Sequence, residues 1–300
     1  MDIALRRIRK CVDGILNLTH LGLKKLPPLP NGLVELIIDR NELTSLPELP
    51  PSLSILSCQD NFLTSLPPLP QLTELYCPDN QLTSLPDLPS TLQRLHCQHN
   101  HLTILPDLPL LKQLICSYNY LTALPELPVS LEEIDCGVNR LPSLPSLSSL
   151  PNLRILDCYR NQLTSLPFLP TALVWCSCFD NHIRLLPPLP EGLQRLFCKQ
   201  NPLETLPELP LGLMKLACIM PYDKMNLMES EEMIDIMEVT PEMVQHINTR
   251  ILNWTEMLEK ESKERCVKRC AQYKERIMIK VWRPSRVERL LDMGYDMEDM

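Results

Sequence analysis

Leucines and prolines return along this chain in a fixed order, with a polar residue at one constant place in every cycle. Three consecutive cycles read LSCQDNFLTSLPPLP from Leu56, LYCPDNQLTSLPDLP from Leu75 and LHCQHNHLTILPDLP from Leu95. A fixed period of about 20 residues predicts a solenoid of stacked coils. The polar residue is an asparagine, and its copies, spaced by 20, 19, 20, 19, 20, 22, 20 and 20 residues, are Asn41, Asn61, Asn80, Asn100, Asn119, Asn139, Asn161, Asn181 and Asn201.

Each cycle predicts a short strand, a turn and an extended return. Around Asn61, we expect Leu56 and Cys58 to point inward from a parallel strand, and Leu63 and Leu66 to reach back into the core. The asparagine is expected to bond unpaired backbone groups of the adjacent turn, so that stacked copies satisfy one another. The closing LPxLP cannot be helical, because proline fixes φ and holds its predecessor extended. The convex side is therefore predicted to be extended or polyproline-like.

Nine cysteines occupy one position of the cycle, two residues after a core leucine. Free cysteine behaves as a small buried apolar side chain, and a straight file of thiols cannot converge on a tetrahedral metal site. We therefore predict reduced thiols that fill the interior in a reducing, cytosol-like compartment, and neither a metal nor a cofactor. The nine are Cys58, Cys77, Cys97, Cys116, Cys136, Cys158, Cys178, Cys198 and Cys218.

The cycles are bounded by an N-terminal cap and interrupted once. Residues 2–12 are predicted to form an amphipathic helix with Leu5, Ile8 and Val12 on one side, and residues 1–32 combine this helix with a degenerate capping repeat. Residues 33–220 form the solenoid of about ten repeats. After Asn139 the sequence RLPSLPSLSSLPNL contains two extra residues and a serine cluster. These residues are either a tolerated insertion on the convex side or a local bend.

Residues 221–300 are predicted to be an acidic, methionine-rich linker and a helical tail. Thr240, Pro241 and Glu242 signal a helix start, as cap, first-turn residue and partner of the helix dipole. The helical module would cover the open end of the sheet, where an uncovered edge strand invites aggregation, or would stay free of it. Apolar residues then recur at helical spacing: Val244, Ile247, Ile251, Trp254 and Leu258.

Charge and hydropathy exclude several classes of partner. The net charge of −8 is split evenly, with 16 basic and 20 acidic groups in residues 1–220 and 13 and 17 in residues 221–300. No half is basic, so a nucleic-acid partner is not expected. Neither a secretory signal nor a membrane-spanning segment is recognisable. We therefore expect a cytoplasmic protein that binds neither nucleic acid nor membranes.

The phrase LxxLxCxxNxLTxLPxLPxxL matches the leucine-rich-repeat signature. Over roughly residues 15–218 it resembles the short repeats of secreted enterobacterial effectors, the YopM- and IpaH-like proteins, which usually have an aliphatic residue where this chain has cysteine. The resemblance implies an α/β solenoid, a horseshoe with a parallel sheet on its concave side. Some of those effectors carry a helical ubiquitin-ligase domain with a catalytic Cys-x-Asp motif. Here such triplets begin at Cys58, Cys77 and Cys178, inside the repeat frame, whereas the tail's Cys266 and Cys270 do not fit the motif.

The ending, IMIKVWRPSRVERLLDMGYDMEDM, resembles the C-terminal segment of many proteins of giant DNA viruses of amoebae. The likeness rests on Trp-x-Pro-x-Arg-Val, followed by Leu-Leu and Gly-Tyr. It implies a viral protein that acts in the cytoplasm of a host cell, and it says nothing about chemistry.

Aromatic residues gather at the strand positions that flank the inward leucines and cysteines. Large aromatics on a rigid sheet are typical binding hot spots, whereas the alternative is lateral packing between strands. Their charged neighbours are mixed: Arg94, Arg160 and Lys199 with Glu74, Glu133, Asp135 and Asp157. The predicted partner-binding residues are Tyr76, Tyr118, Tyr159, Trp175, Phe179, Phe197 and Arg195.

Chemistry is harder to find in the sequence. There is no glycine-rich phosphate loop, zinc-protease motif or nucleophile elbow, and His96, His99 and His101 are interpreted as surface residues. The first hypothesis is a non-enzymatic module that binds a protein partner on its concave face. The alternatives are a ubiquitin-ligase-type effector that uses a tail cysteine, and a structural component of a virion.

Overall fold

The computed structural model describes residues 2–11, 13–218, 237–245, 247–249, 251–252, 260 and 263–264. The chain forms two compact units, Met1–Asn248 and Thr249–Met300. The described residues of the second unit are helical, and the remainder of the predicted helical module, including Trp254, Cys266 and Cys270, lies outside the described residues.

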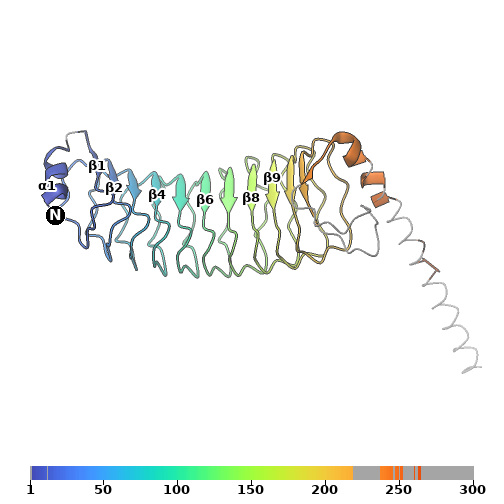
Figure 1. The fold of residues 1–300 in the computed structure, drawn as a ribbon, viewed down its shortest axis with the longest axis horizontal. Coiled ribbons are helices and arrows are strands. Elements are labelled where there is room, and N and C mark those ends of the chain that lie inside the picture. The colour runs from blue at the N-terminus through green and yellow to red at the C-terminus, as the bar shows by residue number, and fades with distance from the viewer. Residues whose placement is uncertain are drawn as a thin grey trace, which may run out of the picture. The chain divides into compact units, whose positions relative to one another are not determined.

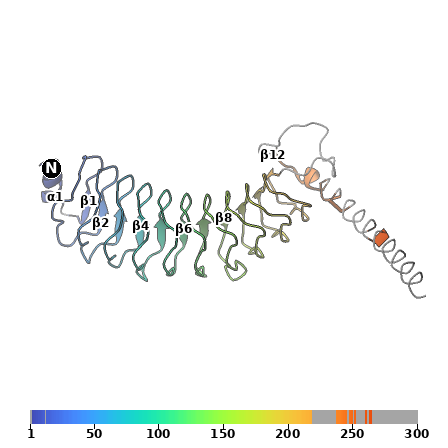
Figure 2. The same ribbon diagram turned by 90° about the horizontal axis from the view of Figure 1, so that it is seen from below.

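The first unit is built around one sheet whose strands follow one another in sequence order. β1 to β11 are parallel, and β12 pairs antiparallel with β11. The strands lie side by side along the concave side of this unit, and the chain returns on the opposite side (Figures 1 and 2). Their bounds are β1 Ile15–Asn17, β2 Glu35–Ile37, β3 Ile55–Ser57, β4 Glu74–Tyr76, β5 Arg94–His96, β6 Gln113–Ile115, β7 Glu133–Asp135, β8 Ile155–Asp157, β9 Trp175–Ser177, β10 Arg195–Phe197, β11 Lys215–Ala217 and β12 Met237–Glu238.

The core is a narrow file between the sheet and the return segments. In each parallel strand the central residue is buried and its two neighbours face the concave side. Leu56, Cys58 and Leu63 are fully buried and Leu66 is 8% exposed, which confirms the predicted inward positions. Between residues 18 and 214 the described return segments contain no helix. The prolines therefore act as predicted, and stability comes from stacking, because each coil contacts only its neighbours.

The asparagines tie each coil to the preceding one. Asn61 Oδ1 accepts a hydrogen bond from the Leu43 N–H at 3.1 Å, while its amide nitrogen donates to the carbonyls of Ile38 at 3.0 Å and Cys58 at 3.2 Å. The same pattern recurs around Asn119 and Asn181. The prediction for this position is confirmed, because each buried amide satisfies backbone groups that the short strands leave unpaired.

The residue before each asparagine has a left-handed backbone. Its φ lies between 50° and 57° in every regular repeat from Arg40 to Gln200. Aspartate and histidine tolerate this region better than other residues, and Asp60, Asp79, His99 and Asp180 occupy it here. The strand thus turns sharply at a fixed place, which positions the following asparagine between two coils.

The insertion after Asn139 lies on the convex side and leaves the sheet intact. β7 and β8 pair Asp135 with Asp157 in the register that the other strands use. Leu147 and Leu150 are buried, whereas Ser148 and Ser149 are exposed. The interpretation as a tolerated insertion is therefore confirmed at the level of strand pairing.

The two ends of the unit differ from the expectations in detail. The N-terminal helix α1 is shorter than predicted, Asp2–Arg9, and it buries Ala4 while Leu5 is 36% exposed. Arg7 anchors α1 by donating to the Asn17 carbonyl at 2.9 Å. None of the helices formed by the described residues is long and apolar enough to cross a membrane.

At the other end, a strand that the sequence interpretation did not predict pairs with the edge of the sheet. β12 lies in the segment interpreted as an irregular linker, and Val239 extends the pairing through its N–H to the Met214 carbonyl at 3.0 Å. The helix start at Thr240 is confirmed, since its hydroxyl accepts from the Met243 N–H at 3.3 Å. Hydrogen bonding to Thr240 also lowers the pKa of Glu242.

Candidate functional site: the concave aromatic face

Five of the predicted aromatics lie on or just beyond the strands from β6 to β10, where they make two groups of contacts. Tyr159 and Phe179 stack with ring centroids 4.9 Å apart and an interplanar angle of 11°. Trp175 and Phe197 meet at 5.2 Å with a tilt of 40°. Tyr159 and Phe179 hold equivalent positions of neighbouring repeats, which lie about 4.8 Å apart. Trp175 and Phe197 meet diagonally, because the register pairs Trp175 with Arg195 and Phe197 with Ser177. We call Tyr118, Tyr159, Trp175, Phe179 and Phe197 the aromatic face.

A glycine in β7's continuation lets Tyr159 lie flat on the sheet. Gly137 is buried, and a Cβ on it would collide with the Tyr159 ring. Burial raises the pKa of Tyr159, and a hydrogen bond with Tyr118 raises it further. Tyr118 is 38% exposed and lies at the left-handed turn after β6, where it stacks on His99 at 4.1 Å. The aromatic face therefore reaches from the sheet to its rim, the row of left-handed turns that precede the asparagines.

Trp175 is fixed from three sides. Its indole N–H donates to Asp157 Oδ1 at 3.2 Å, Phe197 packs against its ring, and the Arg195 guanidinium lies 5.0 Å from its centroid. A cation over an indole is an attractive contact. Arg195 thus acts first as a support of Trp175, a role that the sequence interpretation had not distinguished from partner binding.

Tyr76 does not belong to this surface. It lies on β4, donates to Glu74 at 2.6 Å and meets His96 edge-on at 4.8 Å. Glu74 also pairs with Arg94 at 2.7 Å. Burial, followed by the bond to Glu74, raises the pKa of Tyr76. Of the predicted residues, the structure groups those on β6 to β10 and separates Tyr76 from them.

A second aromatic group on the rim was missed by the sequence interpretation. His101 stacks on Tyr120 at 5.7 Å, and the Arg140 guanidinium lies 4.7 Å from the Tyr120 centroid. The three residues follow the asparagines of successive repeats. Recurrence of large side chains at that position was the signal that could have found them.

Three carboxylates lie beside the aromatic face. Glu133 and Asp135 project from β7, and Asp157 projects from β8. Burial raises the pKa of Asp157 and the charges of Asp135 and Glu133 raise it further, while hydrogen bonds from Ser177 and Trp175 oppose this shift. The face is therefore negative at β7 and β8 and positive at Arg195 on β10.

The interior cysteines do not form a catalytic centre. Cys58, Cys77 and Cys178, which begin the Cys-x-Asp triplets, are fully buried. Burial raises the pKa of Cys58 and Cys77, and it raises that of Cys97 to about 12. A thiol that stays protonated at neutral pH is a poor nucleophile. Within the described part of the chain, no group of three or more His, Cys, Asp or Glu side chains could hold a metal ion.

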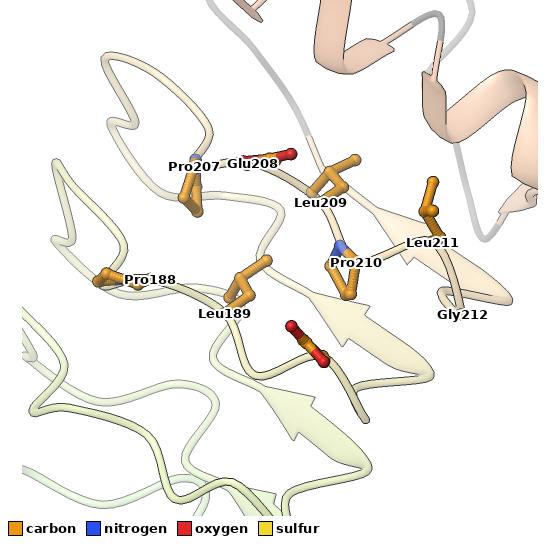
Figure 3. Close-up of a pocket in the computed structure, with 9 residues that line it drawn as sticks. Pro188, Leu189, Pro207, Glu208, Leu209, Pro210, Leu211 and Gly212 are labelled. Carbon is orange, nitrogen blue, oxygen red and sulfur yellow. The ribbon is translucent and has the colours of Figure 1, made fainter.

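The convex side carries a groove of about 800 Å³ between two closing turns. Pro188 and Leu189 line it from one turn, and Pro207 to Pro210 line it from the next (Figure 3). Asn248 holds the second turn, since it donates to the Leu209 carbonyl at 2.9 Å and accepts from its N–H at 2.8 Å. The groove is lined mainly by proline and leucine and offers little catalytic chemistry.

Comparison with known proteins agrees with this architecture. The family model "Leucine Rich repeats (2 copies)" matches residues 51–90 and 129–171. No curated protein sequence matches the chain.

Two solved structures of YopM are similar to this chain. YopM from Yersinia enterocolitica is 45% identical with a TM-score of 0.69, over 71% of this chain and 48% of that one. YopM from Yersinia pestis, described as a leucine-rich effector protein, is 33% identical with a TM-score of 0.62, over 73% of this chain and 78% of that one. This chain thus spans about half the length of the first relative. The chain belongs to the YopM-type family of leucine-rich-repeat proteins.

Proposed function

We propose that this protein is a non-enzymatic interaction module that binds a protein partner on its concave face, at the aromatic face. Leucine-rich-repeat solenoids generally serve protein–protein interaction through their extended concave surfaces. The observation that carries the proposal is the pair of ring contacts, Tyr159 with Phe179 and Trp175 with Phe197, on half-exposed side chains of a rigid sheet. Such pre-ordered aromatics bury large areas on binding at little entropic cost.

Lateral packing alone accounts less well for these aromatics. Ring stacking between neighbouring strands is present, as the alternative interpretation requires. However, the four rings in these contacts are still half-exposed, and Tyr118 is 38% exposed. Packing between strands and binding of a partner are compatible, because the first fixes the geometry that the second uses.

The proposed setting is the cytoplasm of a host cell. The reduced, buried cysteines suit a reducing compartment, and the tail's resemblance to giant-virus proteins suggests an amoebal host. The relationship to effector proteins is consistent with a protein that acts on host proteins. Catalysis is not part of the proposal, because the described cysteines of the repeats are buried away from any substrate.

Affinity capture from an amoebal lysate tests the proposal. The wild-type chain is compared with a Trp175→Ala, Phe179→Ala, Phe197→Ala variant, after circular dichroism has confirmed that both fold. The matched control is Phe62→Ala with Phe168→Ala, because these aromatics are 50% and 72% exposed but lie outside the aromatic face.

We expect a protein that the wild type and the control variant capture and the concave variant does not. Equal capture by all three chains would exclude the aromatic face as the binding site. Absence of any captured protein would favour a structural component of a virion instead.

A further inference from the structure

The three carboxylates beside the aromatic face are held by uncharged donors. Asp135 and Asp157 are direct neighbours in the register of β7 and β8, and Glu133 lies two residues before Asp135. Hydrogen bonds from uncharged donors fix the position of a carboxylate and leave its negative charge on the surface. The donors are the Gln113 amide at 2.6 Å, the Ser117 hydroxyl at 2.7 Å, the Gly137 N–H at 3.0 Å, the Trp175 indole at 3.2 Å and the Ser177 side chain, which bonds Asp157.

No base of the described chain neutralises these carboxylates. The ion pairs among the described residues join other groups, such as Arg94 with Glu74 and Arg160 with Asp180. Arg195 lies over the Trp175 ring instead. A patch of like charge that is partly removed from water is unfavourable by itself, and a cation from outside would relieve it.

Aromatic rings frame the carboxylates on two sides. Tyr159 follows Asp157 by two residues on the same face of the sheet, and Trp175 reaches Asp157 from β9. Both rings are fixed, Tyr159 by Phe179 and Trp175 by Phe197. Ring faces beside carboxylates suit a guanidinium, which stacks on aromatics and bonds carboxylates through its planar fork.

We propose that the aromatic face takes an extended segment of a partner protein, with an arginine side chain over Asp135 and Asp157 and apolar side chains on Trp175 and Phe197. The inference deepens the proposed function and rests on it. Arg195 sets the direction in which the segment binds. Its positive charge would repel a second basic side chain at β10 and attract an acidic one. The carboxylates and β10 are separated by about 12 Å, from strand spacings of about 4.8 Å, which about four residues of extended chain span.

A synthetic peptide with the sequence Gly-Gly-Arg-Leu-Ala-Leu-Glu-Gly-Gly is the probe. Its affinity for the full chain is measured by fluorescence anisotropy at low ionic strength and compared with that of the same peptide containing citrulline, the uncharged analogue of arginine. We expect the arginine peptide to bind about tenfold more tightly. In the Asp135→Asn, Asp157→Asn variant, which keeps the side-chain oxygen acceptors, we expect the two peptides to bind alike.

Glu35→Gln is the matched control, because Glu35 lies on the same face of the sheet at β2, and it should keep the preference for arginine. Equal binding of the two peptides to the wild type, or no binding of either, would overturn the inference. If the concave alanine variant still loses its captured partner in that case, the proposed function stands and only the arginine preference falls. If the concave alanine variant captures the partner as well as the wild type does, the proposed function itself is contradicted.

Discussion

At the scale of single residues, the repeat depends on one buried amide per coil. Asn119 accepts from the Leu102 N–H at 2.9 Å and donates to the carbonyls of Cys97 at 3.0 Å and Cys116 at 3.1 Å. It is 5% exposed, so water cannot replace it. The sequence predicted this role because a polar residue that recurs between buried leucines must find backbone partners.

Removal of one amide should therefore weaken the whole stack. We expect Asn119→Ala to lower the free energy of unfolding by about 3 kcal/mol, because several buried backbone groups lose their partner. Urea unfolding measures the loss. Asn152→Ala serves as the control, because Asn152 is exposed and makes one long contact of 3.5 Å. Similar losses in the two variants would contradict a structural role of the asparagine column.

The left-handed turn gives a second residue-scale prediction. Val138 has φ = 50°, a region that β-branched residues rarely adopt. We expect Val138→Asn to raise the free energy of unfolding by about 1 kcal/mol, because asparagine tolerates this conformation. Val129→Asn, at an exposed valine without positive φ, should not stabilise. A loss of stability in Val138→Asn, measured by urea unfolding, would show that valine packing outweighs the backbone strain.

Side-chain direction within the site was only partly predictable. Positions flanking the inward leucines and cysteines predict that Tyr159, Trp175 and Phe197 lie on the concave side. Trp175 in β9 and Phe197 in β10 hold such positions, and all three side chains are half-exposed. The sequence did not indicate that Gly137 makes room for the Tyr159 ring. Nor did it indicate that Arg195 would lie over Trp175. Such details depend on rotamers across neighbouring strands, which spacing does not encode.

At the scale of elements, each coil tolerates changes on its convex side. The return segment makes no sheet hydrogen bonds, so its length is set only by the need to place its leucines in the core. The insertion after Asn139 illustrates this, since β7 and β8 keep their register across it.

Deletion of Ser148 and Ser149 should therefore be nearly neutral. Both residues are exposed, and their removal returns the spacing from Asn139 to Asn161 to 20 residues. We expect the free energy of unfolding to change by less than about 1 kcal/mol, as for changes in surface loops. Differential scanning calorimetry measures this. Cooperative unfolding that splits into two transitions would show instead that the insertion fixes a bend between two halves of the stack.

The end of the sheet shows where element prediction failed. β12 has only two residues, Met237 and Glu238, and lies in the acidic, methionine-rich segment that was interpreted as an irregular linker. Its pairing with β11 satisfies backbone groups of an edge strand. Because this pairing uses main-chain atoms, the side-chain pattern gave no sign of it. The helix start at Thr240 was predictable because a capping side chain carries the signal.

At the scale of the whole molecule, the cysteine file couples stability to pH. Burial raises the pKa of these thiols in the folded chain, to about 12 for Cys97 and about 11 for Cys218. A neutral buried thiol contributes its full stability below the pKa of the unfolded chain, roughly 8.5. The contribution is lost as the pH rises toward the folded pKa values, because the unfolded chain then releases protons that the folded chain retains.

We therefore expect steep alkaline unfolding above roughly pH 9. Between its unfolded and folded pKa values, each buried thiol lowers the free energy of unfolding by about 1.4 kcal/mol per pH unit. Urea unfolding at several pH values gives the slope. A Cys97→Val, Cys116→Val variant should lose stability less steeply, because two of its buried groups no longer titrate. Equal slopes for the variant and the wild type would show that other groups control the alkaline transition.

Site-specific photo-crosslinking tests most directly whether a partner protein binds the concave aromatic face. Benzoylphenylalanine replaces Phe179 on the concave face in one chain and Phe168, which is 72% exposed outside the aromatic face, in another. Each chain is irradiated with the captured partner. We predict a covalent adduct from position 179 and none from position 168. An adduct from position 168 alone would contradict the claim and move the binding site away from the sheet.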